Sequence, residues 1–112
     1  MTPRLDPVIH APTRLSIMAL LAGVTEAEFS TVRDSVGISD SVLSKQASAL
    51  EAAFYVKIRK GYVGKRPRTW LSLTPAGRDA FDAHVAALQR IVAQAGTTLT
   101  PAVPAARRPS GL

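Results

Sequence analysis

Six lysine and arginine side chains lie within twelve consecutive residues near the middle of this sequence. They fall between positions 57 and 68, with no acidic residue among them. Outside this stretch the eight remaining basic residues equal the eight acidic ones, so the net charge of +6 is concentrated here. Such a patch suits the phosphates of a nucleic acid or an anionic membrane surface, whereas charge that serves only solubility is spread more widely. The six cations are Lys57, Arg59, Lys60, Lys65, Arg66 and Arg68.

A second group of polar side chains occupies one face of a predicted helix over residues 40–52. Leu43, Ala47 and Leu50 form a narrow apolar stripe at 100° per residue, which predicts the buried face. The outward arc carries short hydroxyl side chains and one lysine, where an ordinary solvated helix carries Glu and Lys pairs. Side chains this short let a helix approach the base edges of a DNA major groove closely. The candidate contact residues, including the predicted helix cap, are Ser39, Ser41, Val42, Ser44, Lys45, Gln46 and Ser48.

Each of these side chains has a definite contact chemistry. The serine hydroxyls donate or accept hydrogen bonds, Lys45 reaches guanine acceptors or a phosphate, and Val42 suits a thymine methyl group. Gln46 pairs with adenine if its side chain points outward, although its angle on the helix places it nearer the margin of the core. Arg14 and Arg33 lie on or beside the preceding helices, and we expect them to be surface charges more than phosphate contacts.

Other kinds of site find no support in the residues. There is no cysteine, which excludes disulfides and thiolate metal sites, and His10 and His84 lack carboxylate or cysteine partners at metal-ligand spacing. No glycine-rich phosphate loop and no carboxylate pair with a histidine is present, so we expect no enzyme activity, cofactor or metal. No apolar run reaches signal-peptide or membrane-spanning length, so we expect a soluble cytoplasmic protein that does not bind a membrane.

Two short helices are expected before the polar one. The first spans about residues 13–22, and an extended link with a minor strand fits residues 25–29. A second helix begins at the cap Ser30, runs to Val36 and stops before Gly37. The apolar positions of the first helix are Leu15, Met18, Ala19 and Leu21.

The basic cluster is expected to lie on a β-hairpin. Residues 54–59 alternate apolar and basic side chains after Tyr55, residues 61–64 supply turn residues, and residues 69–73 form a second short strand. Trp70 is expected to stack on the hairpin or to join the domain core. On such a projection, lysine and arginine contact phosphates or enter a narrow minor groove. The alternative is a charged loop that only prevents edge pairing.

A long helix is expected after the hairpin, capped by Thr74 and ending near Ala95. Apolar residues recur on it at steps of four and three over roughly 30 Å, which is the spacing of a coiled-coil seam. A helix of this length extends past its own small domain, so we expect the seam to meet a second copy of the chain. The predicted dimer interface consists of Phe81, Val85, Leu88, Val92 and Ala95.

The chain length allows one domain. We expect an irregular N-terminal arm over residues 1–11, a domain over residues 12–95 that includes the dimerisation helix 74–95, and a disordered tail over residues 96–112. The predicted fold class is mainly α with a small β-hairpin.

Two stretches resemble a known family. Residues 36–51 resemble the turn and recognition helix of small bacterial winged helix-turn-helix regulators in the broad MarR/ArsR grouping. Residues 57–78 resemble the wing of that group and its typical helix start, here Leu73-Thr74-Pro75-Ala76-Gly77-Arg78. The resemblance covers residues 5–92. Many relatives carry a histidine at the position of Gln46, and the chain lacks the extra dimerisation helices of full-length MarR proteins.

This resemblance implies a dimeric transcriptional regulator, with a repressor favoured because a compact dimer has no obvious surface for recruiting polymerase. Two recognition helices in successive major grooves imply a pseudo-palindromic operator with half-sites about one helical turn apart. A small-molecule effector between the long helices is allowed, but no polar cluster marks its site. The alternatives are a winged-helix protein-interaction module without DNA binding and an RNA-binding winged helix.

Overall fold

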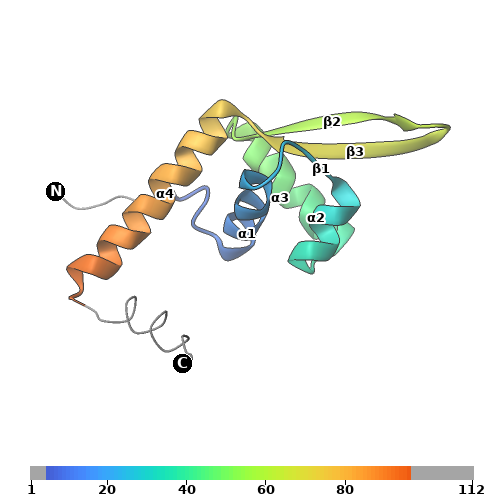
Figure 1. Cartoon of the computed structure of the whole chain (residues 1–112). Helices are drawn as coiled ribbons and strands as arrows, with labels where there is room; N and C mark the ends of the chain where they lie inside the picture. Colours follow the sequence, from blue (N-terminus) through green and yellow to red (C-terminus); the bar gives the residue numbers. More distant parts are fainter. Residues whose placement is uncertain (1–4, 97–112) are drawn as a thin grey trace, which may run out of the picture.

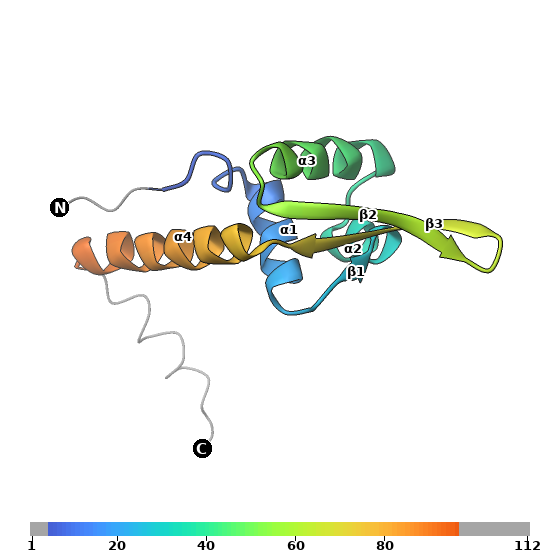
Figure 2. The same cartoon turned by 90° about the horizontal axis from the view of Figure 1, so that it is seen from above.

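A computed structural model describes residues 5–96 as three short helices, a small sheet and one long helix (Figure 1). The hairpin and the long helix extend in opposite directions from the body formed by the short helices (Figure 2). The predicted class, mainly α with a β-hairpin, is therefore confirmed. In chain order the elements are α1 (Pro12–Ala22), β1 (Ala27–Glu28), α2 (Phe29–Val36), α3 (Asp40–Ala52), β2 (Val56–Val63), β3 (Arg66–Leu73) and α4 (Pro75–Gln94).

One apolar core joins these elements. Helix α3 contributes Leu43, Ala47 and Leu50, all buried as the stripe predicted. The inward face of α1 differs from the prediction, because Ile17 is fully buried whereas Ala19 is exposed. The larger side chain removes more apolar surface from water, and this decides the rotation of the helix. The remaining core residues are Ile9, Met18, Leu21, Val32, Val56 and Leu71.

Helix α3 begins as expected. Gly37 closes α2 in a left-handed conformation with φ of 79°. The Ser39 hydroxyl then accepts a hydrogen bond of 3.2 Å from the Val42 amide, which caps α3. An ion pair also links α2 to the first residue of α3, since the guanidinium of Arg33 lies 2.8 Å from a carboxylate oxygen of Asp40. The order of α2, turn and α3 is that of a helix-turn-helix.

The predicted cap of α2 is wrong. The minor strand β1 pairs Glu28 with Trp70 of β3, so the chain is extended up to Glu28 and α2 starts at once with Phe29. Ser30 therefore lies inside the first turn, and its hydroxyl donates to the Glu28 carboxylate at 3.4 Å. The sheet order is β1-β3-β2, antiparallel throughout.

The hairpin is longer than predicted. Gly61, Tyr62 and Val63 belong to β2, and the turn contains only Gly64 and Lys65 between the paired residues Val63 and Arg66. Gly64 has φ of 63°, which a two-residue hairpin turn requires. A Cβ at Gly61 would lie 3.2 Å from the Trp70 ring. Because glycine has no side chain, the ring can lie close to this position of β2.

Helix α4 starts against the base of the hairpin. The Thr74 hydroxyl accepts from the Gly77 amide at 2.9 Å and donates to the Phe54 carbonyl at 2.6 Å, so the predicted cap is confirmed. A Cβ at Gly77 would lie 2.8 Å from the Tyr55 carbonyl carbon and closer still to its oxygen. The glycine of the helix-start motif is thus needed for close backbone approach. Phe54 precedes this contact with φ of 65°.

The described part of the predicted arm packs onto the domain. Residues 7–9 form a turn, and Ile9 is fully buried in the core. The Asp6 amide donates to His84 of α4 at 3.1 Å, and the Tyr55 hydroxyl donates to the Asp6 carboxylate at 2.5 Å. The other arm residues, 1–4, and residues 97–112 of the predicted tail lie outside the described range.

Candidate nucleic-acid interface

The outward face of α3 is open to solvent over its whole length. Ser41, Ser44, Lys45 and Ser48 are exposed, and Val42 is 39% exposed beside them. Ser39, at the cap, is also exposed. The helix thus presents short hydroxyl groups around one lysine, with an apolar side chain at the edge of the face.

Gln46 differs from the other predicted contacts on α3. It is half-buried, and its side-chain oxygen accepts a hydrogen bond of 2.9 Å from Nε of Arg14 in α1. The predicted position near the margin of the core is therefore confirmed. Arg14 is no simple surface charge, since it is half-buried and also donates to the Val8 carbonyl at 3.0 Å.

The cations of the hairpin fall into two groups. Lys57, Lys60, Lys65 and Arg66 are exposed and make no ion pair with any residue from 5 to 96. Arg59 and Arg68, in contrast, each pair with an acid. The partner of Arg59 is Glu26, which precedes β1, and the partner of Arg68 is Glu28 of β1; residues 26–28 are called the β1 segment. The structure therefore leaves four hairpin cations available for an external anion.

The two ion pairs join the hairpin to the β1 segment. Arg59 lies 2.7 Å from the Glu26 carboxylate, and its guanidinium sits 4.0 Å from the centre of the Trp70 ring. Arg68 lies 2.9 Å from the Glu28 carboxylate. The hydrogen bond from Arg59 is the main reason why the pKa of Glu26 is lowered. Trp70 therefore stacks on the hairpin, one of the two roles expected for it.

Sequence reasoning missed both acids because they are distant along the chain. The stretch 57–68 contains no acid, but β1 pairs with β3 and brings Glu26 and Glu28 to the hairpin. The only signal was the short extended link at residues 25–29, in which two acids alternate with an alanine.

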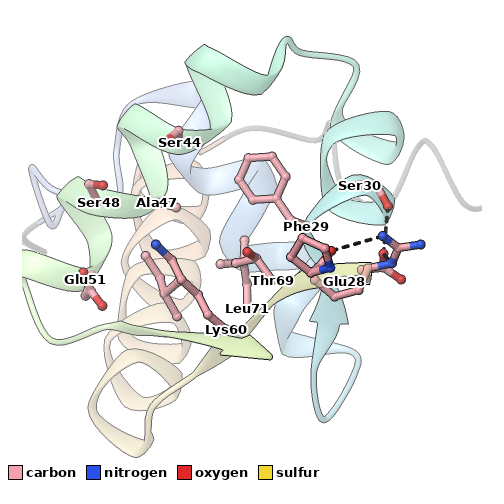
Figure 3. A pocket seen from close by; sticks show the side chains of 13 residues that line it. Glu28, Phe29, Ser30, Ser44, Ala47, Ser48, Glu51, Lys60, Thr69 and Leu71 are labelled. Carbon is pink, nitrogen blue, oxygen red and sulfur yellow. Dashed lines mark hydrogen bonds and ion pairs between the residues drawn. The ribbon is translucent and has the colours of Figure 1, made fainter. Parts of the chain in front are cut away.

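A groove of about 820 Å³ lies between α3 and the hairpin. Ser44 and Ser48 line it from the helix and Lys60 from β2, as Figure 3 shows. Lys60 reaches the groove because it shares a strand face with Ile58, which also lines it. The groove thus connects the polar face of α3 with the cationic hairpin. Its other lining residues are Glu28, Phe29, Ser30, Ala47, Glu51, Pro67, Arg68, Thr69 and Leu71.

The far end of the hairpin combines charge with apolar surface. Tyr62 is 72% and Val63 57% exposed, next to the turn that carries Lys65. Pro67 lies opposite Tyr62 across the strand pair. A tip with this composition offers both cations and apolar area to a partner.

The described residues contain no metal cluster and no membrane-spanning helix. Within residues 5–96 no three potential ligands among His, Asp and Glu gather around a point that would hold a metal ion. None of the helices in that range combines the length and apolar character needed to cross a membrane. Burial lowers the pKa of His84, whose Nδ1 accepts the Asp6 amide proton and whose Nε2 has no partner in the described chain.

Comparison with known proteins agrees with this geometry. A family model described as "Winged helix DNA-binding domain" matches residues 13–92, which include α3, the hairpin and most of α4. The chain belongs to this winged helix family. This assignment confirms the resemblance to winged helix proteins that was drawn from the sequence.

Individual relatives are distant in sequence. The chain is 27% identical to the uncharacterized protein MJ0432 of Methanocaldococcus jannaschii over 78 residues, which are 70% of this chain and 85% of that protein. A transcriptional regulator homologue of Pyrococcus horikoshii OT3 superimposes with a TM-score of 0.75 at 24% identity, covering 80% of this chain and 89% of that one. Mb0332 of Mycobacterium bovis, described as a homodimeric winged helix-turn-helix domain and a possible ArsR-family regulator, gives a TM-score of 0.55 at 26% identity, covering 78% and 72%.

Part of the surface of α4 does not pack against the rest of the domain. The face of α4 that is buried within the chain contains Gly77, His84 and Ala87. The centre of the predicted seam is rotated by about 70° from the centre of this face at 100° per residue, so the two faces adjoin. Within the seam Phe81 packs against the core and Val85 and Leu88 are half-buried, whereas Val92 is 38% exposed and Ala95 is exposed.

Proposed function

We propose that this winged helix protein is a sequence-specific transcriptional regulator that binds double-stranded DNA. One observation carries the proposal. The short polar face of α3, through Ser44 and Ser48, and one unpaired cation of the hairpin, Lys60, border the same groove. A helix with such a face fits the major groove, while an adjacent cationic hairpin follows the phosphates.

The two elements have different tasks in this proposal. The helix α3 reads base edges through Ser41, Val42, Ser44, Lys45 and Ser48, with Ser39 and Gln46 at its margins. The hairpin grips phosphates or enters the minor groove through Lys57, Lys60, Lys65 and Arg66. Arg59 and Arg68 contribute less to this grip, because each must share its charge with an acid of the β1 segment.

We further propose that the protein acts as a homodimer joined through α4. The exposed part of the seam, with Val92 and Ala95, supports this, and Ile91 adds a side chain that is 39% exposed. The homodimeric state described for Mb0332 agrees with such an arrangement. Two copies related by a two-fold axis bind a pseudo-palindromic operator with half-sites about one helical turn apart.

A repressor is the favoured mode of action, because a compact dimer on an operator blocks access to DNA without any further surface. A regulator of this kind works where the chromosome lies, so we place it in the cytoplasm with the nucleoid. No effector is assigned.

Selection of bound fragments from random duplex DNA tests the proposal. The wild-type protein is expected to enrich a two-fold symmetric motif, and Lys45→Ala or Ser44→Val is expected to change the enriched bases. An exposed position on the far side of α4, Ala86→Ser, serves as the matched control and leaves the motif unchanged. Recovery of no motif, or stronger retention of structured RNA in a competition, contradicts the proposal.

A further inference from the structure

The side chain of Gln46 is held from outside its own helix. Arg14 of α1 donates from Nε to the Gln46 oxygen at 2.9 Å and from Nη1 to the Val8 carbonyl at 3.0 Å. The guanidinium thus bridges the N-terminal turn, α1 and α3. Both Arg14 and Gln46 are half-buried, so the contact is partly shielded from water.

Arg14 is itself fixed in place. The Val8 amide donates to the Asp6 carboxylate at 2.9 Å, and the next residue, Ile9, is fully buried in the core. The Val8 carbonyl therefore offers Arg14 a rigid anchor. Because this anchor forms on folding, no further ordering of the pair is needed when a ligand binds.

The hydrogen bond decides which way the Gln46 amide faces. Arginine has only donors, so the group opposite its Nε must be the amide oxygen. The amide nitrogen then points away from Arg14. It has no hydrogen-bond partner among residues 5–96, and it is not among the buried unsatisfied atoms, so it reaches the surface with both N–H groups unused.

An amide fixed in this orientation can form fewer kinds of hydrogen bond with a base than a mobile amide can. A mobile glutamine pairs with adenine through both of its groups, because the oxygen accepts from N6 and the nitrogen donates to N7. Arg14 takes one of the two lone pairs of the Gln46 oxygen and turns that oxygen toward α1, so Gln46 presents mainly its two N–H donors to a ligand. Donors match guanine O6 or N7, thymine O4 or a phosphate oxygen.

We infer that Arg14 is a positioning residue that turns the N–H groups of Gln46 toward hydrogen-bond acceptors on the DNA. It disfavours the two-point contact with adenine that the sequence suggests for a glutamine at this place on α3, because that contact needs the Gln46 oxygen turned toward the base. The inference rests on the proposed function and names one determinant of base choice in each half-site. Arg14 acts through Gln46 and does not itself touch the base.

The test compares base preference among variants of the full chain. The affinity of each variant is measured by fluorescence anisotropy on duplexes that carry each of the four base pairs in turn at every half-site position. The position at which Gln46→Ala loses discrimination identifies the Gln46 contact. There the wild type is expected to disfavour adenine by about tenfold relative to the preferred base.

Two further variants separate positioning from a purely structural contact. Arg14→Met removes the donor, frees the amide and is expected to bring adenine within about twofold of the preferred base at that position alone. Gln46→Glu keeps the contact with Arg14 but has no N–H to present, so it is expected to lose the preference while its thermal stability is retained. The thermal midpoints of all variants are recorded to show that each is folded.

The outcomes distinguish the inference from the function on which it rests. If the wild type discriminates among duplexes and folded Arg14→Met keeps the same base profile, the positioning role is overturned while the DNA-binding function stands. If Gln46→Glu keeps the wild-type preference, the donor role of the amide is overturned. If the wild type binds all duplexes alike, the proposed function fails, and the inference fails with it.

Discussion

Replacement of Gly77 by alanine tests the junction between the hairpin and α4. The added Cβ would lie 2.8 Å from the carbonyl carbon and 2.9 Å from the Cα of Tyr55, distances that real Cβ atoms essentially never show. The obstructing atoms belong to the backbone, so no side-chain rotation relieves the overlap. The start of α4 must move away from Tyr55, and that movement strains the cap that Thr74 provides through the Gly77 amide.

The expected cost follows from three contributions. Overpacking against a backbone costs about 3 kcal/mol, and a weakened cap adds about 1 kcal/mol. The better helix propensity of alanine returns at most about 1 kcal/mol. The free energy of unfolding should therefore fall by about 3 kcal/mol, which for a domain of this size lowers the thermal midpoint by roughly 10 to 20 °C.

Thermal unfolding followed by far-ultraviolet circular dichroism measures this change. Protein concentration is kept constant, because the proposed dimerisation would make the midpoint depend on it. Gly23→Ala is the matched control, since a Cβ there meets only the Leu20 carbonyl oxygen at an ordinary 3.7 Å. The control should keep or slightly raise the midpoint. A midpoint for Gly77→Ala at or above that of the wild type would refute the close approach.

Three further predictions concern stability and assembly. Phe54 has φ of 65° and is 77% exposed, so Phe54→Gly should raise the free energy of unfolding by about 1 kcal/mol in urea titrations; a lower midpoint would contradict this. Burial lowers the pKa of His84 from its ordinary 6.5, so on acidification below that value the unfolded chain takes up a proton before the folded one does. Stability should consequently decline from pH 7 toward pH 5, and His84→Asn should decline less; parallel profiles would exclude His84 as the cause. Val92→Glu should shift the molar mass in light scattering from dimer toward monomer, while Ala86→Glu on another face of α4 should not; an unchanged mass for Val92→Glu would place the interface elsewhere.

The parts of the fold that local chemistry determines were predictable. Ser39 and Thr74 cap helices as expected, because each satisfies an amide in the first turn that follows it. The stripe of Leu43, Ala47 and Leu50 likewise needs only helical periodicity. These local features were sufficient to predict α3 and α4, the two helices that carry most of the proposed function.

The parts that depend on distant pairing were not predictable in the same way. Gly61 and Gly64 both look like turn residues, and only the strand register, together with the Trp70 ring above Gly61, selects Gly64. The pairing of Arg68 with Glu28 depends on β1 lying beside β3. The bond between Arg14 and Gln46 depends on how α1 packs against α3. In the proposed complex, the ion pair of Arg68 and the hydrogen bond of Gln46 determine how these two side chains are presented to DNA.

The salt dependence of DNA binding by the hairpin tests the central claim most directly. Lys65 and Arg66 are exposed, and neither has an ion-pair partner in residues 5–96, so Lys65→Gln with Arg66→Gln removes two charges without breaking a contact within the described chain. Anisotropy titrations across a range of salt concentrations should show the log K against log salt slope reduced by about 1.8, at roughly 0.9 per phosphate contact, on every duplex tested. Arg90→Gln, an exposed cation on α4, should leave the slope unchanged. A double variant with the affinity and slope of the wild type would show that the hairpin does not hold the DNA.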